Sequence, residues 1–422
     1  MKSLVYFMIA ASLIGAGNFS LGFGPFQLSI YRGLLIVLFA TVLIVDFKNN
    51  ENSLRTSKEN RYSVLFMTVW LVYAVLSLVW VKDVSAWFKA VFFLGSGFMG
   101  IIVFIYYLRS LNDILNAFRA FVPMILFHNM VGWYEWITGR YMFLPAALVP
   151  TYQRVRYPVS TFGNTNNLGL FLIFSCFILF VFFISSERKI LRFSYIAGIG
   201  SSLLLLFFTK SRASLLGLMF GLVFLFILSV RRKVAGRVFL ALSGLLLLAV
   251  IIKPDLITSV SNKINTLLTF DFSQQSGSEF VRINLIKNGL EFWMSTIGFG
   301  TGAGNIEYWM EHFAVYNVAA VYNIHNWWLE ILVCFGIFIF TGYIVFYVKL
   351  LQSMWDRIRN SSEKVNAAMA VGIMSFMIAY IIASISASSN MNSEWLWVFW
   401  GIVIAYQGLR SQKTEEKKIT DE

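Results

Sequence analysis

Charged residues are scarce in this sequence, at 13% of 422 residues. Soluble domains contain about 25% charged and about 45–50% apolar residues, whereas 58% of this chain is hydrophobic. The mean hydropathy is +0.71. This composition excludes a water-soluble globular enzyme. Because a bilayer span needs roughly 20 apolar residues in a helix, the sequence predicts an all-α polytopic membrane protein with about twelve transmembrane helices.

Cysteine and histidine are also rare. The two cysteines, Cys176 and Cys334, lie in apolar runs, so we expect no disulfide framework. The three histidines, His128, His312 and His325, are far apart and have neither cysteines nor paired carboxylates nearby. This pattern predicts no metal site and an activity that needs no metal.

Acidic residues are fewer than basic ones, with 21 Asp and Glu against 34 Lys and Arg and a net charge of +13. In a soluble protein this excess would suggest binding to nucleic acid. In a membrane protein it is typical of cationic loops on the cytoplasmic side. We therefore expect a lipid bilayer, and no nucleic acid, as a partner.

Apolar runs separated by charged breaks give the expected spans. They lie near residues 3–19, 29–46, 63–80, 89–107, 118–137, 166–184, 193–209, 213–230, 238–253, 326–348, 367–387 and 395–408. The opening MKSLVYFMIAASLIGAG resembles a signal peptide, but no small-residue cleavage site leads into a soluble domain, so we expect it to be retained. With the N-terminus inside, most Lys and Arg fall in short inner loops. This predicts a multi-pass protein of the cytoplasmic (inner or cell) membrane, with both termini cytoplasmic.

Two expected outer segments are long, near 138–165 and 254–325, and the outer cations are concentrated in a few places. These cations are Arg154, Arg156, Lys210, Arg212, Arg282 and Lys287. Such groups bind phosphate, and arginine does so bidentately. Alternatively, they anchor helix ends or contact lipid headgroups. The tight turn TKSRAS favours the phosphate role for Arg212, because the side chain has little room to move.

His325 stands where a span begins, in YNIHNWWLEIL. An imidazole can act as a base near neutral pH, and Asn326 beside it can donate and accept hydrogen bonds. Glu330 is too far along the helix for a direct pair with the histidine to be assured. The alternative is a capping or interfacial histidine beside an aromatic belt formed by Trp327 and Trp328.

Three further segments carry polar or glycine patterns. In FGNTNN (162–167), the amide of Asn164 either binds sugar hydroxyls or caps a helix. The segment GFGTGAGN (298–305) lacks a surrounding βαβ pattern, so it predicts a tight turn and no dinucleotide cofactor. Residues 279–294 predict an amphipathic helix on the membrane surface. Its apolar residues are Ile283, Ile286, Leu290 and Trp293, with Asn284, Asn288 and Glu291 opposite. His128, inside an apolar run, is expected to be buried and hydrogen-bonded.

Four segments together resemble the O-antigen ligase/polymerase superfamily, which includes Wzy-type polysaccharide polymerases and TuaE-like teichuronic-acid polymerases. They are FGNTNNLG, SRASLLGL, VRINLIKNGLEFWMSTIGFGTGAGN, and His325–Asn326–x–x–Leu329 followed by Gly336. The resemblance covers roughly residues 160–345. It implies four parts: N-terminal transmembrane helices and a first outer loop (1–160), an O-antigen ligase-like core (161–348), C-terminal transmembrane helices (349–408) and a cytoplasmic tail (409–422).

The resemblance implies a fold like that of C-type membrane glycosyltransferases, with a large extracytoplasmic loop. The donor would be an oligosaccharide on undecaprenyl diphosphate, and transfer would occur on the outer face. Arg212 and Arg282 would hold the diphosphate, and His325 would act on the acceptor hydroxyl. Further substrate contacts would come from Arg154, Arg156, Lys210, Asn164, Asn326 and Glu330. Fixed cations would replace a metal, and direct displacement would invert the anomeric centre.

These features favour a polymerase of a cell-surface polysaccharide, such as a capsule or teichuronic acid. The alternative within the superfamily is a ligase that moves a finished glycan to another acceptor. A transporter of lipid-linked glycans fits the span count, but the two halves of the chain are unlike and one outer loop is long. A flippase and a chain-length regulator are the further partners that a polymerase would have.

Overall fold

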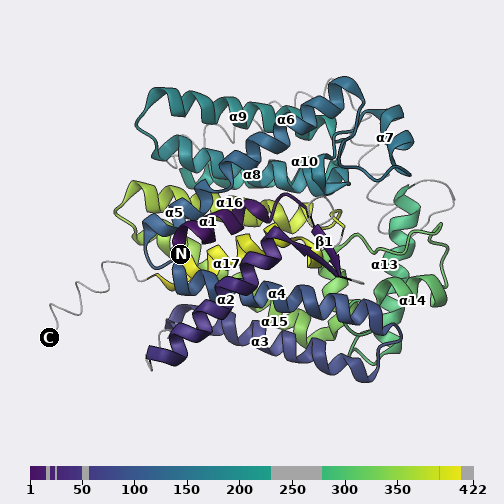
Figure 1. Cartoon of the computed structure of the whole chain (residues 1–422). Coiled ribbons are helices and arrows are strands. Elements are labelled where there is room, and N and C mark those ends of the chain that lie inside the picture. Colours follow the sequence, from purple (N-terminus) through teal and green to yellow (C-terminus); the bar gives the residue numbers. More distant parts are fainter. Residues whose placement is uncertain (16–19, 24–25, 50–56, 230–277, 389, 410–422) are drawn as a thin grey trace.

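The structure is a computed structural model that describes residues 1–15, 20–23, 26–49, 57–229, 278–388 and 390–409. The helices of the bundle lie side by side (Figure 1). They are α2 (Ile30–Asn49), α3 (Lys58–Leu76), α4 (Val84–Tyr107), α5 (Leu111–Arg119), α6 (Val122–Thr138), α8 (Thr165–Ser185), α9 (Lys189–Phe208), α10 (Arg212–Ser229), α15 (Trp327–Asn360), α16 (Lys364–Ala383) and α17 (Glu394–Gly408). The all-α polytopic prediction is confirmed.

Eight helical segments within the described ranges are long and apolar enough to cross a membrane, counting α5 and α6 together as one. They correspond to eight of the expected spans, but the count of twelve is not confirmed. The first expected span is only α1 (Lys2–Ala11), because the helix ends before Gly15, whose φ is 86°. Ten residues extend about 15 Å, half of a bilayer core. The expected spans 213–230 and 395–408 are short helices, and 238–253 lies outside the described residues.

The core of the bundle is formed by helices that are apolar on every side. α8 and α16 are mostly buried, which is why their sequences show no polar face. Small residues allow α10 to lie close against α16: a Cβ atom at Gly217 would come within 2.6 Å of the Ala379 carbonyl oxygen. Close approach at glycine is the usual basis of helix packing in membranes, where apolar burial gives no preference for protein over lipid.

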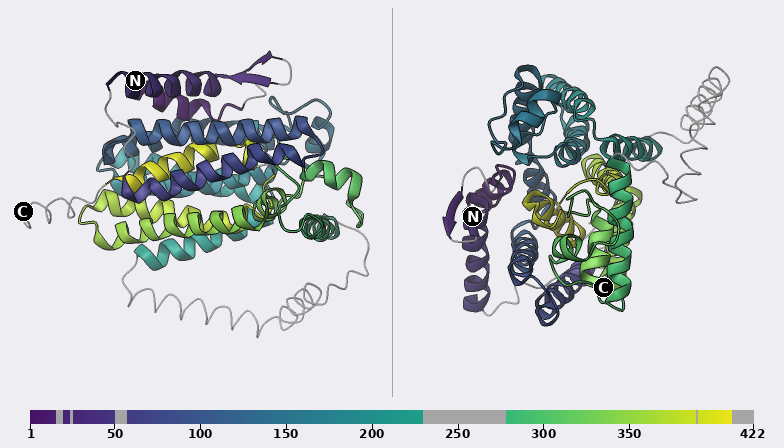
Figure 2. Two further views of the ribbon diagram at one scale, coloured as in Figure 1. Left: turned by 90° about the horizontal axis from the view of Figure 1, so that it is seen from below. Right: turned by 90° about the vertical axis from the view of Figure 1, so that its right-hand side faces the viewer.

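The two ends of the bundle differ. At one end, Lys2 of α1 forms an ion pair of 2.6 Å with Asp113 of α5, and Arg357 near the end of α15 donates to backbone carbonyls at the end of α17. At the other end lie the hairpin β1 (Ser20–Phe23) and β2 (Phe26–Ser29) and the short helices α7 (Val149–Val155), α13 (Ser278–Ser295) and α14 (Ile306–Phe313) (Figures 1 and 2). We call these the terminal end and the loop end.

A buried ion pair braces the loop end, and nothing in the sequence pattern pointed to it. The Arg32 Nε of α2 lies 2.6 Å from the Glu394 Oε1 of α17, and both side chains are 9% exposed. Arg32 also donates to the Gln27 carbonyl oxygen of β2 at 2.6 Å, and its guanidinium lies over the rings of Phe92 and Phe93. Such a pair is stable inside a protein only because its hydrogen-bonding groups are satisfied.

Candidate functional site

A break in α15 organises the site. Gly336 has φ 75° and ψ −179°, so the helix is interrupted there. The freed backbone groups are satisfied by the glycine-rich turn 298–302: Thr301 N–H donates to the Val333 oxygen at 2.8 Å, and Ile337 N–H donates to the Gly298 oxygen at 3.0 Å. Irregular backbone at this depth is tolerated where it is paired within the protein. The predicted tight turn is therefore confirmed.

The turn depends on glycine for its backbone shape. The four residues Gly298, Gly300, Gly302 and Gly304 all have positive φ, between 71° and 91°. This is a region that residues with a Cβ adopt only under strain. In addition, a Cβ atom at Gly300 would lie 2.7 Å from the Val333 oxygen and 2.8 Å from the Gly336 nitrogen. The alternation of glycines in the sequence thus encodes a turn that fits into the break of α15.

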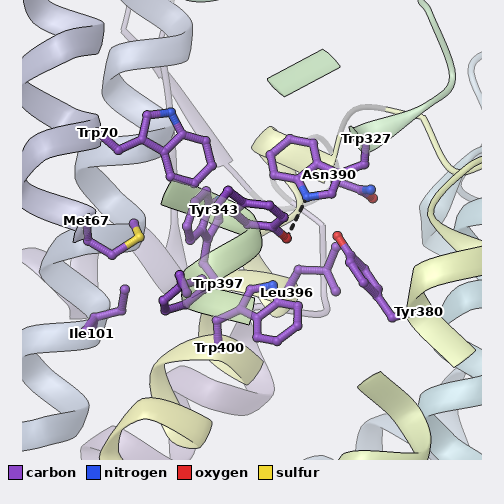
Figure 3. A pocket seen from close by; sticks show the side chains of 11 residues that line it. Met67, Trp70, Ile101, Trp327, Tyr343, Tyr380, Asn390, Leu396, Trp397 and Trp400 are labelled. Carbon is purple, nitrogen blue, oxygen red and sulfur yellow. Dashed lines mark hydrogen bonds between the residues drawn. The ribbon is translucent and has the colours of Figure 1, made fainter. Parts of the chain in front are cut away.

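Residues 326–328 fix the start of α15. Asn326 Oδ1 accepts from the Leu329 N–H at 3.2 Å and so caps the helix. Trp327 N–H donates to the Ser384 oxygen at 3.1 Å, and its indole donates to the Tyr343 hydroxyl at 2.9 Å. Figure 3 shows this indole within an aromatic cluster that surrounds a cavity of only about 10 Å³. The residue just before this anchored start, His325, is therefore held in a defined place.

His325 itself has an unusual backbone and an unsatisfied ring nitrogen. Its φ is 48°, and its N–H donates to the Asn323 Oδ1 at 2.9 Å. Its Nδ1 is buried and has no hydrogen-bond partner among the described residues. Burial lowers the pKa of this imidazole, nearby Arg282 lowers the pKa further, and Glu307 opposes them. The ring is therefore neutral near pH 7 and can accept a proton.

Helix α13 carries Arg282 and lies across the loop end of the bundle (Figures 1 and 2). The helix is confirmed, but its polar stripe does not face water. Asn284 and Asn288 are buried and donate to the backbone oxygens of Asn317 and Tyr316 at 2.8 and 2.9 Å. Asparagine is used here because its amide satisfies both donors and acceptors of an extended segment. Arg282 lies on the exposed side of the helix.

Arg212 is the first residue of α10 and is exposed. The preceding Ser211 hydroxyl donates to the Asn166 Oδ1 of α8 at 2.7 Å. The next residue of α8, Asn167, bonds Ser388 at 3.0 Å, in the segment that also bonds Trp327 through Ser384. Arg212 and His325 therefore lie at the same end of the bundle, and residues 384–388 contact the neighbours of both. Arg282 is near enough to His325 to affect its pKa.

Four further residues that the sequence offered as substrate contacts are also at the loop end. Arg156 follows α7 and lies against Gly139, and Arg154 is exposed on α7. Lys210 packs over the Phe207 ring at 4.7 Å. Asn164 caps α8, with its Oδ1 accepting from the Asn166 N–H at 2.8 Å. None of the described hydrogen bonds or ion pairs joins these residues to His325.

His128 is buried and hydrogen-bonded, as expected, and His312 is at the surface. His128 is fully buried, and its Nδ1 lies 2.9 Å from the Ser160 hydroxyl. His312 is exposed, with its Nδ1 2.9 Å from the Tyr308 oxygen. The cysteines are free and buried. Within the described ranges, no group of three His, Cys, Asp or Glu side chains is placed to hold a metal ion.

A polar cavity of about 360 Å³ opens beside His325, and the sequence analysis missed it. Its lining includes Lys89, Glu307, Tyr308, Glu311, Tyr322 and Glu330. Asn323 connects the two places, because its Nδ2 donates to the Glu307 Oε1 at 2.9 Å while its Oδ1 accepts from His325. The sequence did carry one signal: Glu307 and Glu311 are four residues apart, so they share a face of a helix.

Comparison with known proteins agrees with this architecture. The family model described as O-antigen ligase matches residues 197–347, a range that contains Arg212, the glycine-rich turn and His325. The chain is also 30% identical over 413 residues to the teichuronic acid biosynthesis protein TuaE of Bacillus subtilis (strain 168), covering 96% of this chain and 83% of that protein. A match of this extent, together with a helical bundle that places these segments at one end, shows that the chain belongs to the O-antigen ligase/polymerase superfamily.

Proposed function

We propose that this membrane protein of polysaccharide biosynthesis is a polymerase that transfers glycan from undecaprenyl diphosphate to the hydroxyl of an acceptor glycan. The observation that carries the proposal is His325, whose buried Nδ1 has no hydrogen-bond partner among the described residues, at the end of the bundle that also carries Arg282 on α13. A base and a fixed cation at one point are what displacement of a diphosphate requires. The loop end would face outward, with both termini in the cytoplasm.

The chemistry follows from this arrangement. His325 accepts the proton of the acceptor hydroxyl as its oxygen attacks the anomeric carbon. The bond between that carbon and the diphosphate oxygen breaks, and the diphosphate leaves with the electron pair. Arg282, with Arg212 at the same end, stabilises the charge that develops. A single displacement inverts the anomeric centre and needs no metal.

A ligase would use the same chemistry, and the family model's description as O-antigen ligase supports it as the second candidate. The two differ only in the acceptor. Purified protein in liposomes with an undecaprenyl-diphosphate-linked repeat as the sole substrate should produce a ladder of longer lipid-linked chains. Polymerisation is excluded if glycan moves only after a different acceptor is added. If no glycan moves under either condition, transfer itself is excluded.

Arg282→Ala should reduce the rate of transfer by about 10–100-fold, because a hydrogen bond to a charged group contributes about 1.5–3 kcal/mol. Arg282→Lys keeps the charge but loses the bidentate geometry, so it should recover only part of the rate. The measurement is initial rate in liposomes, with inorganic pyrophosphate as a competitor that should lose potency in both variants. Arg188→Ala, an exposed arginine at the terminal end, is the matched control. Equal rates in Arg282→Ala and this control would remove Arg282 from the site.

A further inference from the structure

The cavity beside His325 has the size and chemistry of a ligand site. At about 360 Å³ it falls within the range of small-molecule pockets. It is walled by α4, α14 and the start of α15, all of which are held by the glycine-rich turn and its surroundings. Asn305 fixes two of these walls to each other, because its Oδ1 accepts from the Asp83 N–H at 2.7 Å. The cavity is thus bounded by anchored helix ends.

Its floor holds a carboxylate that lacks a partner. Glu330 lies one turn into α15 and lines the cavity, and among the described residues its carboxylate makes no hydrogen bond or ion pair. Glu330 is partly buried, so a carboxyl group left there without donors indicates a ligand that supplies them. Glu307 and Glu311 add further acceptors at the rim, and Tyr308 and Tyr322 add flat apolar surfaces.

This set of groups selects the chemical class of the ligand. Carboxyl oxygens accept hydrogen bonds, and a protonated carboxyl also donates one, so these groups suit a ligand rich in hydroxyl groups. Aromatic rings suit the apolar face of a sugar ring. Acidic side chains outnumber the one lysine in the lining, with Asp83, Glu307, Glu311 and Glu330 against Lys89, and this disfavours phosphate or an acidic sugar. The described carboxylates do not converge as metal ligands either.

Two charged groups on different helices act on the His325 imidazole. Arg282 belongs to α13, and Glu307 belongs to α14 and lines the cavity. A diphosphate would be attracted to Arg282 and repelled by Glu307. The cavity adjoins His325 through Asn323, which lines the cavity and accepts from the His325 N–H. A neutral acceptor bound there would lie near the imidazole.

We propose that this cavity is the acceptor subsite, and that it binds a neutral, hydroxyl-bearing sugar at the end of the acceptor glycan through Glu330, Glu307 and Glu311. The proposal rests on the proposed transfer reaction and adds to it the position and chemistry of the acceptor. The carrier would then lie toward Arg282 and the acceptor toward Glu307. Glu330 is assigned as a binding residue and takes no part in the proton transfer.

The experiment uses the full-length protein in liposomes, with the undecaprenyl-diphosphate-linked repeat as donor and the methyl glycoside of the same repeat as acceptor. Glu330→Gln should raise the KM for the methyl glycoside about tenfold or more, because an amide NH₂ group replaces a carboxyl oxygen and leaves the sugar hydroxyl that it accepted from without a partner. The KM for the donor and kcat should change less than about threefold. Ser85→Trp, a rim substitution that narrows the cavity without altering a carboxylate, should have the same effect. Glu187→Gln, exposed at the terminal end, is the control.

The outcomes separate the two proposals. If the wild-type protein transfers no glycan, the proposed function fails. If it transfers glycan but both variants keep the wild-type KM for the methyl glycoside, the function stands and the acceptor subsite is wrong. A transfer activity that is lost on adding EDTA and restored by Mg²⁺, in the wild type but not in Glu330→Gln, would make the cavity a cation site and overturn the inference.

Discussion

His325→Asn is expected to lower the rate of glycan transfer by about 10²–10⁴-fold, the usual contribution of a general base. Asparagine is chosen because His325 has a φ of 48°, and asparagine tolerates the left-handed region better than most residues. The backbone hydrogen bond to Asn323 at 2.9 Å and the cap of α15 by Asn326 are then kept. The loss should therefore come from chemistry and not from misfolding.

The control for this substitution is His312→Asn, at the exposed loop histidine. It should keep near wild-type activity. Both variants should elute as monodisperse protein in detergent at the wild-type yield. Polymer synthesis by His325→Asn at more than about a tenth of the wild-type rate would show that the imidazole is not the base.

The pH dependence of transfer follows from the same residue. Burial and Arg282 lower the pKa of His325, so the neutral form persists at a lower pH than in a free imidazole. Activity should therefore be full near pH 7 and should fall on acidification, with a midpoint below about 6.5. The residual activity of His325→Asn should not show this decrease at acidic pH.

Gly300→Ala should destabilise the protein by on the order of 3–5 kcal/mol, from backbone strain and overpacking together. Gly300 has φ 86°, and the three atoms nearest to an added Cβ are all backbone, at 2.7, 2.8 and 2.9 Å. Backbone atoms cannot rotate away as a side chain can. The added methyl would therefore push the glycine-rich turn out of the break in α15, and the start of that helix would move with it.

The measurement is the temperature at which half of the detergent-solubilised protein is lost from the monodisperse peak. Gly200→Ala is the matched control, because Gly200 lies within α9 and has open space where a Cβ would be. That change should be neutral or slightly stabilising, since alanine favours a helix. A Gly300→Ala variant as heat-resistant as the control would mean that the turn does not brace α15.

The fold class could be predicted from composition because few backbone structures can span a bilayer, and a chain with long apolar runs spans it as helices. Spans such as 166–184 and 193–209 were located well because charged loops separate them. The first span was overestimated, since its apolar character continues past the point where Gly15 ends the helix. The ends of spans are set by backbone geometry and packing, which hydropathy does not measure.

For the site, the sequence indicated the chemistry of His325, but not its surroundings. The cavity is formed by α4, α14, α15 and residue 392, which are far apart in the chain. No local sequence pattern could therefore predict it. The buried pair of Arg32 and Glu394 was missed for the same reason. The polar face of α13 was evident from the sequence. Periodicity alone does not show whether such a face contacts water or a polar part of the protein, here the backbone of residues 315–317.

The glycine-rich turn is joined to the broken helix by main-chain hydrogen bonds and by the Thr301 hydroxyl, and this has a consequence for how such proteins diversify. Helix α14, which supplies Glu307, Tyr308 and Glu311, begins immediately after that turn. Its side chains take no part in the bonds that join the turn to α15. Substitutions of these side chains can therefore change which carbohydrate binds. The position of His325 before α15, on which release of the lipid carrier would depend, would not change.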